Sequence, residues 1–278
     1  MPEPGSRLAV ASGLRIGGTA RKVELGLLRS FLLGELTEEV PVDRLIVAGG
    51  VHADKHAEME CREGRLKRSW LAGGGVQRPV AAAAEEADLF LAPLSCRMRL
   101  CLQSGEGLRG DSTKFTTSSI LSLASRCNLE LWSNPASQVI SKVQVVGHAG
   151  QPLALALREA ARGAKPRSAA EIQLQCWREQ YLAPVWPDLL APKARCGSSA
   201  RPDPFSIELS REASKVLLFA GNCKAPQWEF LPASSESTRK RHEEKDVLAI
   251  CVPDFTEDPS ILLINEDLSV QLIKFRLD

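Results

Sequence analysis

The stretch RLAVASGLRIGGTARKVELGLLRSFLLGELTEEVPVDRLIVAGG, residues Arg7–Gly50, decides the fold class. Arg7–Ala11 and Arg44–Ala48 are short apolar runs, each followed by a turn of small residues, as buried strands often are. Between them, Lys22–Leu36 repeats apolar residues at helical spacing. A strand, a helix and a second strand in this order predict two parallel strands joined by a helical crossover, and therefore an α/β fold.

The rest of the chain continues this mixture of strands and helices. Apolar runs predict strands at Arg97–Leu102, Asn128–Trp132, Lys142–Val146, Lys215–Ala220, Asp246–Val252, Ile261–Ile264 and Val270–Phe275. An alanine-rich start predicts a helix at Val80–Leu91, and helices are also predicted at Leu153–Arg162 and Ala169–Gln180. The strands of the C-terminal third follow one another closely, and this spacing favours antiparallel pairing. Composition predicts loops at Ala53–Gly75, Ala183–Pro204 and Ala233–Lys245.

Composition narrows the class of protein. The 278 residues suffice for one large domain or two small ones. A formal net charge of +1 gives no overall attraction for nucleic acid, so we expect DNA contact to be indirect or weak. The 8 cysteines include no C-x-x-C pair, which argues against a structural zinc site and for reduced thiols. Lacking a signal-peptide pattern and a long apolar stretch, the chain is expected to be soluble and intracellular, with no membrane contact.

Histidines and acidic residues mark the places where a metal could bind. His52 and His56, with Asp54 between them, would share one face if their segment were helical. The segment lacks the glutamate of an H-E-x-x-H motif, and an exposed polar loop is the simpler interpretation. Gly147–Gly150 (GHAG) is half of a G-H-x-H metal motif, and a strand followed by a glycine turn explains it equally well.

Other familiar motifs are incomplete. The glycines at Gly17-Gly18 and Gly73–Gly75 fit neither a P-loop nor a dinucleotide fingerprint, so turns are expected there. Ser12 lacks the G-x-S-x-G context of a nucleophile elbow. Arg239–Arg241 (RKR) is at most a weak nuclear localisation signal. The residues by themselves predict no catalytic constellation.

An ordered set of short motifs resembles one protein family. In the C-terminal half these are PVWPDL, DPF, KVLLFAGN and VLAICVPDF at Pro184–Leu189, Asp203–Phe205, Lys215–Asn222 and Val247–Phe255. Upstream they are LAVASGL, LIVAGG, SGE and SNP at Leu8–Leu14, Leu45–Gly50, Ser104–Glu106 and Ser133–Pro135. The set resembles the phosphoesterase domain of the small (B) subunits of replicative DNA polymerases, and is most similar to that of polymerase delta. Gly50 departs from the Ala-Gly-Asn turn usual in that family.

The resemblance implies a calcineurin-like phosphoesterase fold over residues 1–278: an α/β architecture of two packed β-sheets flanked by helices. Active members of that fold hold two metals at strand ends with D-x-H, G-D, G-N-H-[DE] and G-H-x-H motifs. At these places the chain has Ser12, Leu14, Gly49, Gly50, Gly105, Glu106, Gly107, Leu108, Gly221, Asn222, Cys223 and Lys224. Serine, leucine, glycine and lysine do not supply the carboxylates or imidazoles that divalent cations need. An inactive domain without catalytic residue, metal or cofactor is implied.

For function, the resemblance implies a non-catalytic scaffold subunit of DNA polymerase delta in the nucleus. Such a subunit bridges the C-terminal, cysteine-rich region of the catalytic subunit and the third subunit of the complex during DNA replication. Trp132, Trp186 and Trp228 are candidate interface anchors, although core burial is the more common fate of tryptophan. The N-terminal OB-fold domain of the family is expected to be absent from this chain.

Two alternatives stay open. The first is an active metallophosphoesterase with the unusual ligands His52, Asp54, Glu106 and His148, which stoichiometric bound metal would favour. The second stays in the family: the small subunit of DNA polymerase epsilon or alpha, which co-purification with one catalytic subunit would identify.

Overall fold

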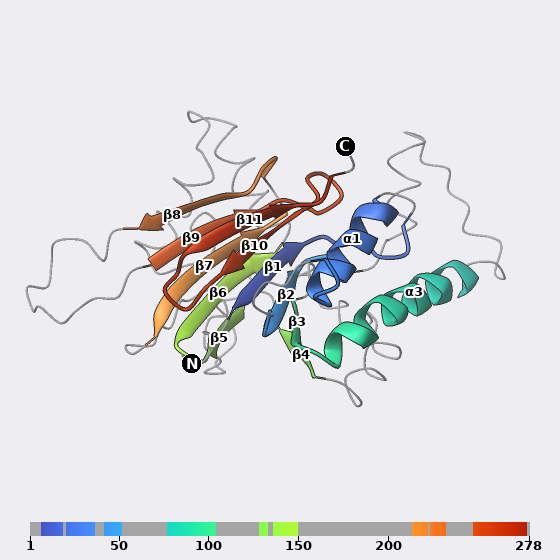
Figure 1. Ribbon diagram of the computed structural model, residues 1–278, viewed down its shortest axis with the longest axis horizontal. Coiled ribbons are helices and arrows are strands. Elements are labelled where there is room, and N and C mark those ends of the chain that lie inside the picture. The colour runs from blue at the N-terminus through green and yellow to red at the C-terminus, as the bar shows by residue number, and fades with distance from the viewer. Residues whose placement is uncertain are drawn as a thin grey trace, which may run out of the picture.

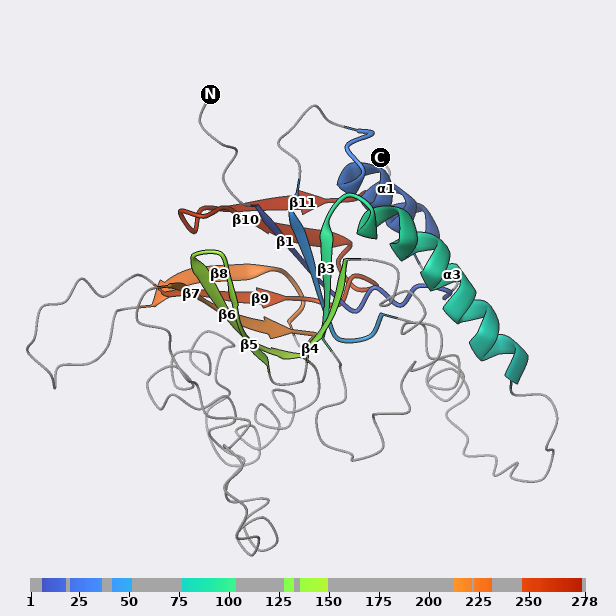
Figure 2. The same cartoon turned by 90° about the horizontal axis from the view of Figure 1, so that it is seen from below.

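The computed structural model describes residues 7–18, 21–36, 42–51, 77–103, 128–132, 136–149, 213–221, 223–231 and 247–276. In these residues two β-sheets are stacked face to face, and two helices lie on the outer face of one sheet (Figures 1 and 2). The predicted mixed α/β class is therefore confirmed. No helix in the described part is long and apolar enough to cross a membrane.

The first sheet has six strands in the order β11-β10-β1-β2-β3-β4. Their bounds are β1 Leu8–Ser12, β2 Arg44–Ala48, β3 Arg99–Gln103, β4 Leu129–Trp132, β10 Ser260–Ile264 and β11 Val270–Lys274. Strands β1 to β4 run parallel, as the strand–helix–strand pattern predicts. Strand β10 pairs with β1 and β11 pairs with β10, both antiparallel, so β11 and β4 are the edges.

The second sheet has five strands in the order β5-β6-β7-β9-β8. Their bounds are β5 Ala136–Ile140, β6 Val143–Ala149, β7 Ser214–Ala220, β8 Gln227–Leu231 and β9 Val247–Val252. Strands β6, β7 and β9 run parallel, and antiparallel β5 and β8 form the edges.

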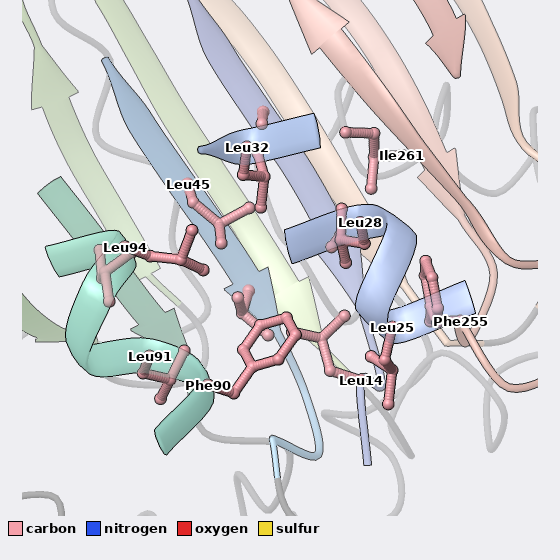
Figure 3. Close-up of a cluster of buried hydrophobic side chains, with 14 of the residues drawn as sticks. Leu14, Leu25, Leu28, Leu32, Leu45, Phe90, Leu91, Leu94, Phe255 and Ile261 are labelled. Carbon is pink, nitrogen blue, oxygen red and sulfur yellow. The ribbon is translucent and has the colours of Figure 1, made fainter. Parts of the chain in front are cut away.

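Helices α1 (Lys22–Leu32) and α3 (Gln77–Ser95) cover the first sheet. Alternate residues of β1 point to opposite faces, so Ala9 and Ala11 meet the helices while Leu8 and Val10 meet the second sheet. Figure 3 shows the helix-side core, to which both helices and the ends of β1 and β9 contribute side chains. Its labelled members are Leu14, Leu25, Leu28, Leu32, Leu45, Phe90, Leu91, Leu94, Phe255 and Ile261.

The second core fills the space between the two sheets. Ile46 of β2 and Val10 of β1 pack there with Val216, Leu218 and Ile250 from the second sheet. Central strands are buried on both faces, which is why RLIVA and VLAICV read as continuous apolar runs. Burial on both faces also fixes the register, because a one-residue slip would exchange the two sets of side chains.

Helix α1 ends earlier than Leu36, where the apolar spacing predicts its end. Gly34 has a φ of +71°, a left-handed conformation that glycine adopts without strain. The amide of Gly34 donates to the carbonyl of Phe31 at 2.9 Å, and that of Glu35 donates to Ser30 at 2.8 Å. This is a Schellman motif, which terminates the helix.

The antiparallel prediction for the C-terminal strands is correct for β10 and β11 and wrong for β7 and β9, which pair parallel. The chain leaves β7, forms β8 at the edge, and returns as β9 between them. Strands β5 and β8 are the two that the apolar runs do not predict. The predicted helices Leu153–Arg162 and Ala169–Gln180 lie outside the described residues, as do the loops predicted at Ala53–Gly75, Ala183–Pro204 and Ala233–Lys245.

Candidate functional site at the carboxyl ends of the parallel strands

The parallel strands of both sheets end on the same side of the molecule. The amide of Phe255, just after β9, donates to the carbonyl of Ser12, the last residue of β1, at 2.8 Å. Ligands of α/β proteins usually bind beyond the carboxyl ends of parallel strands. These ends are therefore the place to look for a functional site.

Glycine turns follow three of the strands there. Gly13, Gly49 and Gly221 have φ values of +54°, +85° and +92°, which few other residues adopt easily. Each turn amide donates to the last residue of a neighbouring strand: Gly13 to Ala48 at 3.1 Å, Gly49 to Gln103 at 3.0 Å, and Gly221 to Val252 at 2.8 Å. Phosphate-binding loops present such amides to the ligand. In this protein they fasten adjacent strands together.

A carboxylate from the second sheet crosses to the first. Asp254 accepts a hydrogen bond from the Ser12 hydroxyl at 3.2 Å and pairs with the Arg15 guanidinium at 3.3 Å. Its side chain keeps only 24% of its surface exposed. A Cβ atom on Gly13 would lie 2.2 Å from Asp254 Oδ1, so only glycine fits beneath this carboxylate. We call these residues, Ser12, Gly13, Arg15 and Asp254, the latch.

The start of α1 holds the same loop. Arg21 donates through Nε to the carbonyl of Thr256 at 3.2 Å and through Nη1 to Glu24 at 2.9 Å. A backbone hydrogen bond, followed by the bond from Arg21, lowers the pKa of Glu24. The loop after β9 is therefore tied to both β1 and α1.

A second crossing joins the sheets at β3 and β6. The buried amide of Gln103 donates through Nε2 to the carbonyl of Gly147 at 2.9 Å. The next residue, His148, lies opposite Phe219 of β7 and is almost wholly buried. Burial lowers the pKa of His148 to about 4, so the imidazole is neutral at physiological pH.

Two cysteines meet beside the latch. Cys223 follows the turn after β7, and its thiol is hydrogen-bonded to that of Cys251 on β9. This bond, then burial and the nearby carboxylates of Glu257 and Asp254, raises the pKa of Cys223. The thiolate, which is the reactive form, is therefore disfavoured.

Among the described residues, the arrangement provides internal contacts and no activated nucleophile. A serine is activated for attack when a base withdraws its proton, and the base in turn is held by a third group. Ser12 donates to a carboxylate that is already paired with Arg15, with no imidazole among these partners. Within the described part of the chain, no group of three or more His, Cys, Asp or Glu side chains could hold a metal ion.

The structure brings together several residues at the places of the phosphoesterase motifs. Ser12, Gly49, Gly221 and Cys223 all lie at these carboxyl ends. Leu14 has no exposed surface and packs in the helix-side core. His148 is also buried. The positions outside the described residues include His52, Asp54, His56, Gly105, Glu106, Gly107, Leu108 and Asn222.

Sequence reasoning missed Asp254 and Arg15 as members of the site. Asp254 is separated from Ser12 by 242 positions, so no local pattern links them. The available signal was an aspartate two residues after a buried strand, next to the proline of Val-Pro-Asp-Phe.

Comparisons with known proteins assign no family. No protein-family profile matches the sequence, and neither does any curated protein. Solved structures do match, among them a crystal structure with a TM-score of 0.42 and 10% identity, over 98% of this chain and 100% of that chain. A likeness at this level carries no argument about fold family or function.

Proposed function

We propose that this chain is a non-catalytic scaffold subunit of the DNA polymerase delta complex, built on an inactive calcineurin-like phosphoesterase domain. The observation that carries the proposal is the ordered set of motifs from LAVASGL at Leu8–Leu14 to VLAICVPDF at Val247–Phe255. Their order along the chain is more specific than any one of them. The role places the protein in the nucleus.

The contacts at the strand ends support the inactive part of the proposal. An active enzyme of this fold would need an aspartate at Ser12 and a histidine at Leu14. Ser12 is instead hydrogen-bonded to Asp254, and Leu14 is buried among apolar side chains. Restoring a metal ligand at Leu14 would require a polar group to leave the core or lie buried in it, which costs free energy.

The proposed partners are proteins. The chain would bind the C-terminal, cysteine-rich region of the catalytic subunit and the third subunit of the complex, and would contact DNA only indirectly or weakly. A net charge of +1 is compatible with this role, because protein interfaces need no excess of charge. A stable contact of this kind buries more than about 1,000 Å².

Co-elution tests the proposal. The chain, with an OB-fold domain of the family supplied, would be mixed at about micromolar concentration with the C-terminal region of the delta, epsilon or alpha catalytic subunit, in three parallel arms. We expect a complex on size-exclusion chromatography in the delta arm alone. Co-elution in another arm would move the assignment within the family, and folded proteins that fail to co-elute in every arm would reject it.

A further inference from the structure

The two long edges of the stacked sheets differ in how well they are closed. At one edge, β8 ends the second sheet, and four of its five residues are exposed. Trp228 has 41% and Phe230 has 56% of its surface exposed. Within the described part of the chain, β8 pairs with β9 alone. Among the described residues, the outer row of backbone N–H and C=O groups of β8 meets no further strand, as at the edge of a sheet.

The two aromatic side chains face the side on which the first sheet lies. Trp228 pairs with Ile250 and Phe230 pairs with Leu248, and paired residues share a face. Ile250 and Leu248 both belong to the core between the sheets. Trp228 and Phe230 extend that apolar face beyond the core and into solvent.

The first sheet contributes apolar side chains on the same side. Its edge strand β11 carries Val270 and Leu272, which are partly buried and pack against the core between the sheets. Strand β1 of the first sheet contacts β9 of the second. Strands β10 and β11 follow β1 toward one edge of the first sheet, and β8 follows β9 toward the same edge of the second. We call the surface formed by Trp228, Phe230, Val270 and Leu272 the open flank.

The opposite flank is closed, so exposure is not a general property of the edges. Trp132 of β4 has only 6% of its surface exposed, and Ala136 and Ile140 of β5 are also buried in the core between the sheets. Leu131 of β4 is exposed, but it lies on the other face of the first sheet. It pairs with Leu102, a member of the helix-side core, and therefore faces the helices.

Three carboxylates lie near the open flank. Glu229 is exposed between the two aromatic residues along β8 and points to the opposite face of the sheet, because its pair partner is Ala249. Glu266 and Asp267 lie in the turn between β10 and β11, where the Arg7 guanidinium donates to Asn265. That turn is at the end of the sandwich where β8 finishes (Figures 1 and 2). None of these three carboxylates forms an ion pair within the described residues. Lys274 and Arg276, toward the other end, both pair with Asp258.

We propose that the open flank binds an extended segment of a different protein, which adds to β8 as a further strand and alternates apolar with basic residues. Such β-augmentation takes affinity from main-chain hydrogen bonds and specificity from alternate side chains. The apolar residues of the segment contact Trp228 and Phe230, and the basic residues, which point to the opposite face of the added strand, lie beside Glu229. The inference goes beyond the proposed function, because it rests on the exposed edge strand β8 and not on the resemblance to polymerase subunits.

A second copy of this chain is the disfavoured occupant. Two β8 strands that pair antiparallel over their whole length place Trp228 opposite Phe230 and Glu229 opposite Glu229. Like charges directly opposite each other destabilise a strand pair. A central glutamate on an edge strand is one of the devices that prevent self-association.

The test uses two fluorescent peptides, one in which valine alternates with lysine and one in which valine alternates with glutamate. We expect the intact chain to bind the lysine peptide with a dissociation constant of about 10–100 µM, and the glutamate peptide at least about tenfold more weakly, by fluorescence anisotropy. The double variant Trp228→Ser/Phe230→Ser should bind the lysine peptide at least about tenfold more weakly. Glu229→Lys should reverse the preference between the peptides.

The matched control is Val139→Ser on β5, an edge-strand residue with 57% of its surface exposed. It should leave peptide binding unchanged, and all variants should melt cooperatively because the substituted side chains are exposed. Equal binding of the two peptides, no binding at about 1 mM, or full binding by the double variant would each overturn the proposal. So would a wild-type dimer in sedimentation equilibrium that Phe230→Ser dissociates, since a second copy would then occupy the flank.

Discussion

The carboxyl ends of the strands and the open flank differ in which groups contact other parts of the protein and which are exposed to solvent. At the strand ends, the turn amides of Gly13, Gly49 and Gly221 and the carboxylate of Asp254 are satisfied within the protein. At the open flank, aromatic side chains remain in water. Catalysis at the strand ends would need polar groups that can reach a substrate. Binding at the open flank needs apolar side chains that can reach a partner. A binding role, as proposed above, would use the open flank rather than the strand ends.

The two described tryptophans should show the largest contrast. Trp132→Ala removes a buried side chain from the closed flank and should lower the free energy of unfolding by about 3–5 kcal/mol. Trp228→Ala at the open flank should lower it by less than about 1 kcal/mol, because the side chain is already partly in water. Urea unfolding measures both. Similar losses of stability for the two variants would show that the two flanks are equally well packed, which would contradict the difference between them.

Gly13 should be the most sensitive glycine of the latch. Gly13→Ala places a left-handed φ on alanine and a methyl group against Asp254, so a loss of about 2–4 kcal/mol is expected. Gly26→Ala is the matched control in α1, where a Cβ atom meets nothing within 4 Å, and it should stabilise the helix by about 0.5–1 kcal/mol.

A double-mutant cycle separates the two causes at Gly13. In the Asp254→Ala background the carboxylate is absent, so Gly13→Ala should cost only the strain of its φ. The double variant should therefore be more stable than the sum of the two single losses predicts. Strict additivity would mean that the carboxylate does not lie over Gly13.

Acid should weaken the second sheet through His148. Its folded-state pKa of about 4 lies below the ordinary value of 6.5, so the unfolded chain binds the proton more tightly. The His148 contribution is intact above about pH 6.5 and is lost as the pH falls toward 4, by up to about 3 kcal/mol. Unfolding curves of wild type and His148→Gln over this range should differ in slope. Parallel curves would place the imidazole in water.

A smaller loss than at Trp132 or Gly13 is expected at the latch carboxylate. Asp254→Asn keeps the shape of the side chain and removes the charge that Ser12 and Arg15 contact. We expect a loss of about 1–2 kcal/mol, since charge-assisted hydrogen bonds are stronger than neutral ones but Arg15 is partly exposed. An unchanged melting temperature would indicate that the latch contributes nothing to stability.

The elements predicted well are those buried on both faces. Arg44–Ala48 is predicted with its observed bounds because a central parallel strand reads as one apolar run. Strand β8 gives no such run, since Gln227–Phe230 lies largely in water and carries no burial pattern. Strand β8, which carries the inferred binding surface, is therefore a strand that the pattern of apolar residues does not predict.

Strand pairing and contacts between distant residues are the other features that the sequence does not predict. The C-terminal strands are predicted to pair antiparallel. The sequence does not reveal that β8 takes the antiparallel place beside β9 and leaves β7 and β9 parallel. The resemblance located Ser12 and Gly221 at strand ends. It gave no sign that Asp254 lies over Gly13, because that contact depends on how the two sheets stack.

Phosphoester turnover tests the central claim, that internal contacts close the strand ends, most directly. The intact chain would be incubated with bis(p-nitrophenyl) phosphate and manganese, beside Asp254→Asn and a variant in which His52, Asp54 and His148 are replaced by alanine. The account predicts no release of nitrophenolate above the buffer rate in any of the three. Manganese-dependent turnover by the wild type that either variant loses would contradict it.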